Sequence, residues 1–290
     1  MQHGRRDDII MIQNNIRRGI FGMKKLFISA DIEGTAGIVN WNETERTMPH
    51  EYDYFANQMT REVSAACEGA HDAGVEQIVV KDAHDSARNL NPAKLPEYAN
   101  IFRGWSRHPY SMMTGLDSTF EGVVFTGYHS AAQMTGNPLS HTMNTQNNYV
   151  KINGQLAPEL MINSLTASSL GVPVYCVCGD RGLCEWLNGI NPNIATVPIN
   201  EGVGSGALTL HPDVAVRRIR ETVSMAIATK KPEECMFPMP DKYVIEISFK
   251  EHFNAYDGSF YPGAKRTGAR TVEFECKDWF DALCFMHFVL

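Results

Sequence analysis

The sequence predicts an α/β fold, with a mostly parallel open sheet, flanking helices and a smaller C-terminal α+β subdomain. Two observations favour this class. Short apolar runs typical of buried strands alternate with longer stretches whose apolar residues recur every three or four positions, as on one face of a helix. Glycine or proline stands where several of these stretches should begin or end. Such alternation is typical of strands and helices packed in layers.

The first half of the chain alternates between strands and one long helix. An apolar strand over residues 26–30 is followed by a helix over 52–73, and Gly74 stands just past the end of that helix. Two further apolar runs, over 77–80 and 122–126, predict buried strands. Each of the three strands is followed directly by polar residues.

The second half opens with a predicted hairpin over 149–156, because Asn153-Gly154 separates two apolar segments. A helix is expected over 158–170, with proline in its first turn and glycine just past its end. The remaining expected elements are strands over 172–178, 194–199, 243–249 and 271–276, and helices over 212–228 and 278–289. The last two strands are expected to pair with each other.

Two boundaries are expected along the chain. Three prolines and mixed charges between residues 230 and 241 interrupt the pattern, which predicts an α/β domain over 23–229 and a subdomain over 230–290. Residues 1–22 carry four arginines and a short apolar patch broken by polar residues, which makes a poor signal peptide. We expect this segment to be a disordered extension ahead of a domain that starts at Met23.

Composition excludes several classes of protein. The chain has 290 residues, 43% hydrophobic and 20% charged, which is typical of a soluble globular protein. No apolar run approaches the ~20 residues of a membrane span. The net charge of −7 disfavours nucleic acid and anionic membranes as partners. The seven cysteines are odd in number and form no Cys-x-x-Cys pair, which indicates reduced thiols and a cytoplasmic location.

Residue types that bind metals follow three of the predicted strands. The first strand leads into Asp31-x-Glu33, the second into Asp82-x-His84 and the third into His129. Residues two apart in an extended chain project to the same side, and the carboxyl ends of the strands form the ligand-binding edge of an open α/β sheet. Each residue alone has an ordinary interpretation as a turn former, cap or loop histidine. Their coincidence at one edge predicts a zinc or manganese site.

Two more residues are candidates for this site. Glu159 lies in the first turn of the helix over 158–170, where the helix dipole favours a carboxylate in any case. His141 lies in a polar loop after His129, where the residue type alone favours an exposed histidine. The pattern by itself therefore assigns neither residue to the site.

Six separated segments occur in an order that is specific to one family. They are Ser29-Ala30-Asp31-Ile32-Glu33-Gly34, Asp82-Ala83-His84-Asp85-Ser86, Gly127-Tyr128-His129, Ser140-His141-Thr142-Met143, Pro158-Glu159-Leu160 and Cys178-Gly179-Asp180. With these segments, the chain from Met23 to near its C-terminus resembles the zinc-dependent D-aminopeptidases of the DppA type.

The resemblance implies a binuclear zinc site, which would make the domain over 23–229 the metal-binding catalytic domain. The implied ligands of two Zn²⁺ ions per subunit are Asp31, Glu33, His84, His129 and Glu159. His141 corresponds to the catalytic histidine of the family. The implied reaction is hydrolysis of N-terminal D-amino acids, such as D-Ala, from short peptides. Members of the family are similar in assembling as homodecamers, which implies a homo-oligomer here.

Two-metal hydrolysis is the mechanism that this set of residues would support. Two zinc ions can activate a shared water and polarise the scissile carbonyl. Asp31, the deepest candidate on the first strand, is the expected bridge between the ions, and Asp82 is expected to orient a histidine ligand. His141 would protonate the leaving amine or stabilise the oxyanion.

Three other functions remain open at this point. The same two-metal chemistry suits an amidase or phosphoesterase that acts on a small molecule. The glycine-rich segment over 202–206 suggests a nucleotide-binding oxidoreductase, but its spacing is not Gly-x-Gly-x-x-Gly, and a flexible connection is the simpler interpretation. A metal-binding scaffold without activity is disfavoured by His141 and the carboxylate-rich site.

Overall fold

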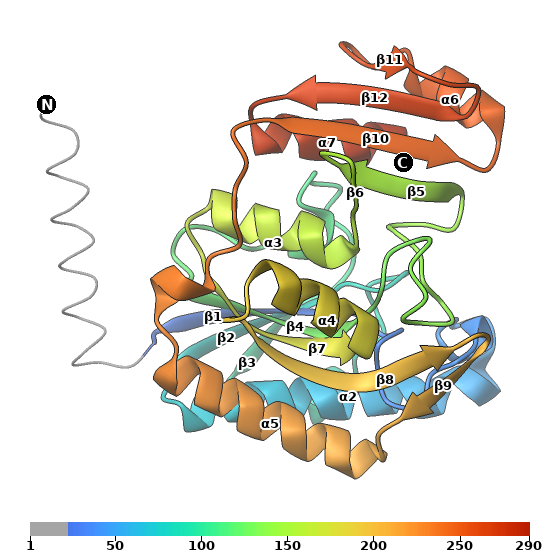
Figure 1. The fold of residues 1–290 in the computed structure, drawn as a ribbon. Helices are drawn as coiled ribbons and strands as arrows, with labels where there is room; N and C mark the ends of the chain where they lie inside the picture. Colours follow the sequence, from blue (N-terminus) through green and yellow to red (C-terminus); the bar gives the residue numbers. More distant parts are fainter. Residues whose placement is uncertain (1–22) are drawn as a thin grey trace, which may run out of the picture.

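The computed structural model describes residues 23–290, so the extension predicted over 1–22 lies outside the described residues. A seven-stranded sheet forms the centre of the molecule (Figure 1). Its strands, in spatial order, are β3 (Ala99–Phe102), β2 (Gln77–Asp82), β1 (Lys25–Ala30), β4 (Gly122–Tyr128), β7 (Val174–Asp180), β8 (Ala195–Val203) and β9 (Gly206–Thr209). All neighbouring pairs are parallel except β8 with β9, which confirms the predicted α/β fold with a mostly parallel sheet.

Helices cover both faces of this sheet (Figure 1). The helices on one face are α2 (Pro49–Asp72) and α5 (Pro212–Thr229), and those on the other are α3 (Glu159–Ser169) and α4 (Arg181–Ile190). Every residue of β4 and β7 is buried, as expected for parallel strands covered on both sides. Two separate clusters of buried apolar side chains fill the space on the two faces.

A second sheet lies beyond α3 and is antiparallel (Figure 1). Its strands, in spatial order, are β11 (Lys265–Arg266), β12 (Thr271–Cys276), β10 (Tyr243–Phe249), β5 (Asn147–Ile152) and β6 (Gln155–Leu156). The predicted hairpin is β5–β6, and the predicted late pair is β10–β12. Because β5 and β6 precede residue 230, this sheet joins the middle of the chain to its end, and the domain boundary at 230 stays a prediction.

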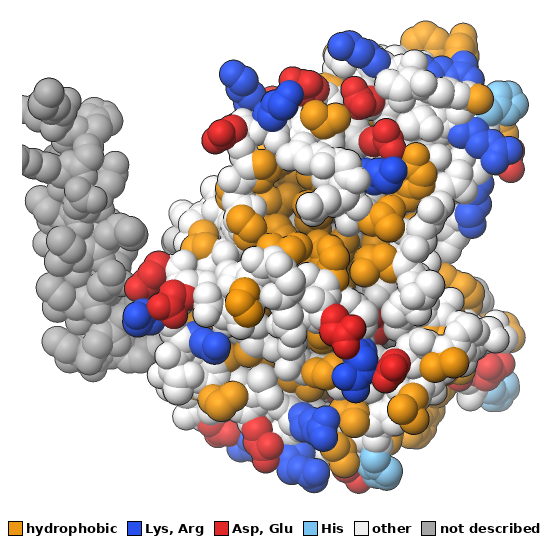
Figure 2. All heavy atoms as spheres, viewed as in Figure 1, with side chains coloured by type: hydrophobic (Ala, Val, Ile, Leu, Met, Phe, Trp, Pro, Cys, Tyr) orange, Lys and Arg blue, Asp and Glu red, His pale blue; other side chains and the backbone are white. Residues whose placement is uncertain are grey.

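The helix α3 lies between the two sheets, and α7 (Trp279–Val289) packs against it. All residues of α3 except Ser169 are buried. The indole of Trp279 on α7 donates a hydrogen bond to the Thr166 hydroxyl of α3 at 3.0 Å. On the face drawn in Figure 2, apolar side chains gather over α3, whereas charged side chains lie mostly on the outer parts of the molecule. The first residue of α3, Glu159, is thereby fixed relative to both sheets.

Several elements differ from the sequence-based expectations. The strands β3 and β9 and the helices α4 and α6 (His252–Gly258) were not predicted. The glycine-rich segment over 202–206 is the β8–β9 hairpin, so it is a connection between strands. No helix among residues 23–290 combines the length and the apolar character of a membrane span. All seven cysteines lie in this part of the chain and are unpaired, with Cys176 and Cys178 buried on β7.

Candidate active site

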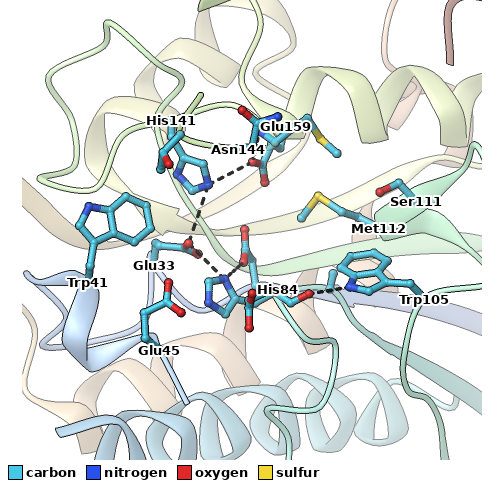
Figure 3. Close-up of a pocket in the computed structure, with 15 residues that line it drawn as sticks. Glu33, Trp41, Glu45, His84, Trp105, Ser111, Met112, His141, Asn144 and Glu159 are labelled. Atoms are coloured by element: carbon cyan, nitrogen blue, oxygen red, sulfur yellow. Dashed lines mark hydrogen bonds and ion pairs between the residues drawn. The ribbon is translucent and has the colours of Figure 1, made fainter. Parts of the chain in front are cut away.

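Six side chains from three strand ends, a loop and a helix converge at one edge of the central sheet. Figure 3 shows Glu33, His84, His141 and Glu159 among them. Because β2, β1 and β4 are neighbours and parallel, the residues that follow them meet at the same edge. The residues are Asp31 and Glu33 after β1, His84 after β2, His129 after β4, His141 from the following loop and Glu159 at the start of α3. The structure thus brings together every residue predicted for the site.

The segment after β1 and the end of β4 approach so closely that only glycine fits at two positions. A Cβ atom on Gly127, whose φ is +68°, would lie 2.1 Å from the Asp31 carbonyl oxygen. A Cβ atom on Gly34 would lie 2.1 Å from the Tyr128 carbonyl oxygen. The backbone N–H of Gly34 instead donates to the Gly127 carbonyl at 2.8 Å. These two glycines let the segments that carry Asp31 and His129 lie against each other.

The loop after β2 is fixed by the carboxylate of Asp82. Its oxygens accept hydrogen bonds from the backbone N–H groups of Asn89 and Leu90 and from the Asn89 side chain. Asn89 also donates to the His84 carbonyl at 2.7 Å. The prediction that Asp82 orients a histidine ring is therefore wrong: its carboxylate is committed to the backbone of the loop that carries His84, and backbone carbonyls orient the rings.

Asp31 presents its two oxygens to two different groups of side chains. Oδ1 lies 3.3 Å from Nδ1 of His84, and the same nitrogen lies 3.1 Å from Oε1 of Glu33. Oδ2 lies 3.6 Å from Nε2 of His129, and this nitrogen lies 3.7 Å from Oε2 of Glu159. In each group of three residues, the potential ligand atoms all lie within 4.8 Å of one another. Asp31 thus belongs to two adjacent donor groups.

His141 lies next to both groups. Its Nε2 is 3.6 Å from Glu159 Oε1 and 3.9 Å from Glu33 Oε1. Its ring stacks on that of His129, with centroids 4.4 Å apart, and Trp41 packs against it at 5.2 Å. Only 14% of its side chain is exposed, so the exposed loop position favoured by its residue type alone is wrong.

Each of the three histidines has one ring nitrogen held by a backbone carbonyl. The contacts are His84 Nε2 to Thr44 O at 3.2 Å, His129 Nδ1 to Ser130 O at 2.9 Å and His141 Nδ1 to Leu139 O at 2.9 Å. A nitrogen that faces a carbonyl carries the proton, so the other nitrogen of a neutral ring turns its lone pair towards the carboxylates. A lone pair that faces carboxylate oxygens is unfavourable unless a proton or a metal ion lies between them. Ligand histidines in metal sites are oriented in this way.

Unsatisfied buried atoms also indicate a cation site. Three buried atoms of the site make no hydrogen bond of good geometry. They are the two carboxylate oxygens of Glu33 and Nε2 of His129. Buried polar atoms are rarely left without partners, because an unsatisfied group costs about 1–3 kcal/mol. Oxygen and imidazole donors together are the ligands that zinc prefers. The residues present therefore fit a zinc site.

The electrostatics of the site follow from its burial. Burial raises the pKa of Asp31 well above its usual range, and the charges of Glu33 and Glu159 raise it further. Burial acts to raise the pKa of Glu33 as well, but the close contact with a charged His84 and the charges of His129 and His141 together outweigh burial and hold this pKa well below its usual range. Carboxylates crowded in this way repel one another, and a divalent cation among them would offset the repulsion.

The pKa values of His129 and His141 are shifted in opposite directions by the same crowded surroundings. Burial acts to lower the pKa of His129, but Glu159, Glu33 and Asp31 outweigh it and raise that pKa to about 9. For His141, burial and then the neighbouring charge of His129 lower the pKa below its usual range. His141 is therefore the histidine of this cluster that stays neutral most readily.

Comparison with known proteins agrees with this geometry. Residues 23–288 match the profile of the peptidase M55 family, described as D-aminopeptidase. The chain belongs to the D-aminopeptidase family. A D-aminopeptidase from Bacillus subtilis (strain 168) is 31% identical over 260 residues, which are 89% of this chain and 93% of that protein. The prediction of a metallo-aminopeptidase of this family is confirmed.

The fold of this family member also matches a solved structure. The zinc-dependent D-aminopeptidase DppA from Bacillus subtilis, described as a self-compartmentalizing protease, is similar with a TM-score of 0.83 and 30% sequence identity. The similarity covers 91% of this chain and 96% of that one. The predicted fold class is confirmed by this match as well as by the sheet topology.

The candidate site of this D-aminopeptidase-family chain opens into a cavity of about 420 Å³ (Figure 3). Besides the clustered residues, its walls include Trp41, Glu45, Trp105 and Asn144. Sequence reasoning missed these residues, because they lie in loops without a regular pattern. Asp180 belongs to one of the segments that carry the family resemblance, but no role was predicted for it: its carboxylate accepts from the N–H and hydroxyl of Ser130 and caps α4, which fixes the segment after β4. The signal that could have found Asp180 is an acidic residue between a strand and a helix.

Proposed function

We propose that the protein is a binuclear zinc aminopeptidase that hydrolyses N-terminal D-amino acids, such as D-Ala, from short peptides. One observation carries the binuclear part of this proposal: the two oxygens of Asp31 face two different donor groups, one with Glu33 and His84 and one with His129 and Glu159. A carboxylate in this position can bridge two ions. The similarity to a zinc-dependent D-aminopeptidase supports zinc as the metal.

The proposed ligands are Asp31, Glu33, His84, His129 and Glu159. Bound zinc would supply a Lewis acid for the scissile carbonyl and would lower the pKa of a bound water to near neutrality. The fold would hold the ligands rigidly. Three of them follow shortly after the ends of β1 and β2, and Glu159 is the first residue of a buried helix. Glu159 Oε1 also accepts from the Met143 N–H at 2.6 Å, which fixes the orientation of its carboxylate.

His141 is the proposed proton donor to the leaving amine. Its Nδ1 is committed to the Leu139 carbonyl, so Nε2 is the atom that can exchange a proton within the site. This atom faces the carboxylates of Glu33 and Glu159, and its ring lines the cavity. In the neutral ring Nε2 carries a lone pair, so it would first take a proton from the attacking water and then pass that proton to the amine nitrogen as the peptide bond breaks, a contribution of about 10²–10⁴-fold to the rate.

The proposal is tested by metal analysis together with paired substrates. We expect purified protein reconstituted with zinc to retain two zinc ions per chain, and to hydrolyse D-alanyl dipeptides faster than their L-counterparts. Preference for the L-series would remove the D-specificity, and one zinc per chain would remove the binuclear site. Hydrolysis of an aryl phosphate or of small amides without hydrolysis of any peptide would favour the alternative two-metal phosphoesterase or amidase instead.

We further propose that the protein forms a homo-oligomer, with ten subunits as the assembly to test. The support is the similarity to a self-compartmentalizing protease. Light scattering or native mass spectrometry of the full chain measures the subunit number directly, and a monomer would contradict the proposal. A cytoplasmic location stays a prediction from the sequence.

A further inference from the structure

Two further cavities adjoin the active-site cavity, each through a different set of shared lining residues. One shares the residues Ser111, Met143 and Asn144 with it and holds about 200 Å³. The other shares Trp41, Glu45, His141 and Thr145 with it and holds about 520 Å³. The two adjoining cavities share no lining residue with each other. A substrate that lies across the site can therefore extend in two separate directions.

The smaller of the two, called here the apolar side pocket, is lined mainly by apolar side chains. They are Tyr110, Met143, Ile162, Leu283, Met286 and Leu290. Its polar lining residues are Ser111, Asn144, Asn163 and His287, and no Asp, Glu, Lys or Arg side chain is among them. The Asn163 amide already donates to the Tyr128 hydroxyl at 2.9 Å. Leu283 and Met286 belong to α7, whereas Ile162 lies one turn after Glu159 on α3. The pocket is built to receive an apolar group beside the metal ligands.

The larger adjoining cavity, called here the polar cavity, has a different character. Gln133, Ser140, Asn148 and Lys250 contribute polar side chains to its walls. It is the cavity that shares His141 with the active site. Because His141 is the proposed donor to the leaving amine, the part of the peptide that departs must lie on the side of the polar cavity.

We propose that the apolar side pocket receives the side chain of the N-terminal residue of the substrate. The inference rests on the proposed function, since the direction of the peptide follows from the role of His141. With the leaving part directed towards the polar cavity, the remaining direction for the N-terminal side chain is the pocket that shares Met143 and Asn144. The enzyme then prefers N-terminal D-residues with apolar side chains larger than that of alanine.

The preference is set by contact with the pocket walls. A missing methylene in an apolar pocket lowers kcat/KM by about 10–200-fold. We therefore expect peptides that begin with D-Leu or D-Phe to be cleaved with a kcat/KM at least about ten-fold above that of D-Ala peptides. The preference depends on residues of α7, which is remote in sequence from all six residues of the metal cluster.

The test compares three dipeptides, D-Phe-Ala, D-Leu-Ala and D-Ala-Ala, on the zinc-loaded full chain and on two pocket variants. Leu283→Phe narrows the pocket and is expected to lower the ratio of kcat/KM for D-Phe-Ala to kcat/KM for D-Ala-Ala by about ten-fold or more. Met286→Ala widens it and is expected to shift the preference towards D-Phe-Ala. The matched control is Phe285→Leu on the same helix, whose ring packs on Phe274 and Tyr261 away from the pocket.

A binding measurement keeps the inference separate from the proposed function. Calorimetry with D-phenylalanine and D-alanine, on zinc-loaded and chelator-treated protein, should show tighter binding of D-phenylalanine that Leu283→Phe removes. If no D-peptide is cleaved but this binding difference is found, the proposed function fails and the pocket stands. If D-peptides are cleaved with equal kcat/KM, or if Leu283→Phe lowers all three equally while Phe285→Leu does not, the pocket assignment is overturned.

Discussion

His84 and His141 lie in one cluster, yet their side chains have different surroundings. His84 Nδ1 is within 3.3 Å of two carboxylates, which is the arrangement of a ligand that shares a cation with them. His141 Nε2 lies 3.6 and 3.9 Å from its carboxylates, much like Nε2 of His129, but the His141 side chain is the most exposed of the three, at 14% against 7% for His84 and 1% for His129. A ligand holds the metal, whereas a proton donor needs access to the substrate.

This difference predicts opposite outcomes for two alanine substitutions. His84→Ala is expected to lose bound zinc, because one donor group loses its only nitrogen. His141→Ala is expected to retain zinc while kcat falls by about 10²–10⁴-fold, the usual contribution of a general acid. Metal analysis and kinetics on the same samples measure both effects, with the exposed His252→Ala as the control. Zinc loss in His141→Ala would show that this residue is a ligand.

At the scale of the elements, the backbone at the end of β4 contacts the backbone after β1, and no space is left between them for a side chain. We expect Gly127→Ala to lower the free energy of unfolding by about 2–4 kcal/mol, because its φ is positive and its Cβ would meet the Asp31 carbonyl. Displacement of Asp31 should also weaken zinc binding. Gly189→Ala on α4 is the matched control, since a Cβ there meets no atom within 4 Å. Equal stability of the two variants in chemical denaturation would refute the steric argument.

The helix α2 carries a buried carboxylate that makes stability depend on pH. Glu62 accepts hydrogen bonds from Gln58 and from the Ala36 N–H, but Oε2 has no partner. Burial raises its pKa from 4.5 to about 7. The folded state therefore holds this proton more tightly than the unfolded state. The resulting stabilisation is fully present below pH 4.5 and is lost as the pH rises through about 7.

Glu62→Gln should remove this dependence, because a neutral amide has no charge to bury. We expect the difference in free energy of unfolding, variant minus wild type, to increase by about 2–3 kcal/mol from pH 5 to pH 8. Urea titrations at both pH values measure the gain, and the exposed Glu51→Gln serves as the control. A difference between variant and wild type that is the same at both pH values would contradict the assigned pKa.

The elements that periodicity predicted and those that it missed differ in length and burial. The buried strands β1, β2, β4 and β7 are continuous apolar runs, so they were visible in the sequence. The strand β3 has four residues and includes Asn100, which leaves too little pattern to distinguish it from a loop. The start of α2 at Pro49 was missed by three residues because its first turn is mostly exposed.

At the scale of the whole molecule, chelation of zinc is expected to lower the melting temperature. Without a cation, three carboxylates and three imidazoles stay buried together, and both oxygens of Glu33 lack hydrogen bonds. A ligand present at about 1,000 times its Kd stabilises the folded state by about 4 kcal/mol. Differential scanning fluorimetry before and after chelation, and after zinc is added back, measures the change. An unaltered melting temperature would show that these residues bind no metal in the folded protein.

The sequence pattern alone predicted only some of the residues that come together in the site. The rule for strand ends placed Asp31, Glu33, His84 and His129 together before the fold was known, because it depends on topology alone. It gave no reason for Glu159, whose position is set by packing of α3 between two sheets. The cavity wall at Trp105 depends on loop conformation, which no local pattern in this sequence determines.

The second sheet has a consequence for synthesis on the ribosome. Asn153, next to β5, accepts a hydrogen bond from Val244, 91 positions later, and β10 is the strand that pairs with β5. At about 5–20 residues per second, translation leaves β5 without its partner for on the order of 5–20 s. All six clustered residues have emerged by then, while a bare strand edge is open to other nascent chains. The nascent chain is therefore more open to association through this strand edge during that interval than the folded protein is.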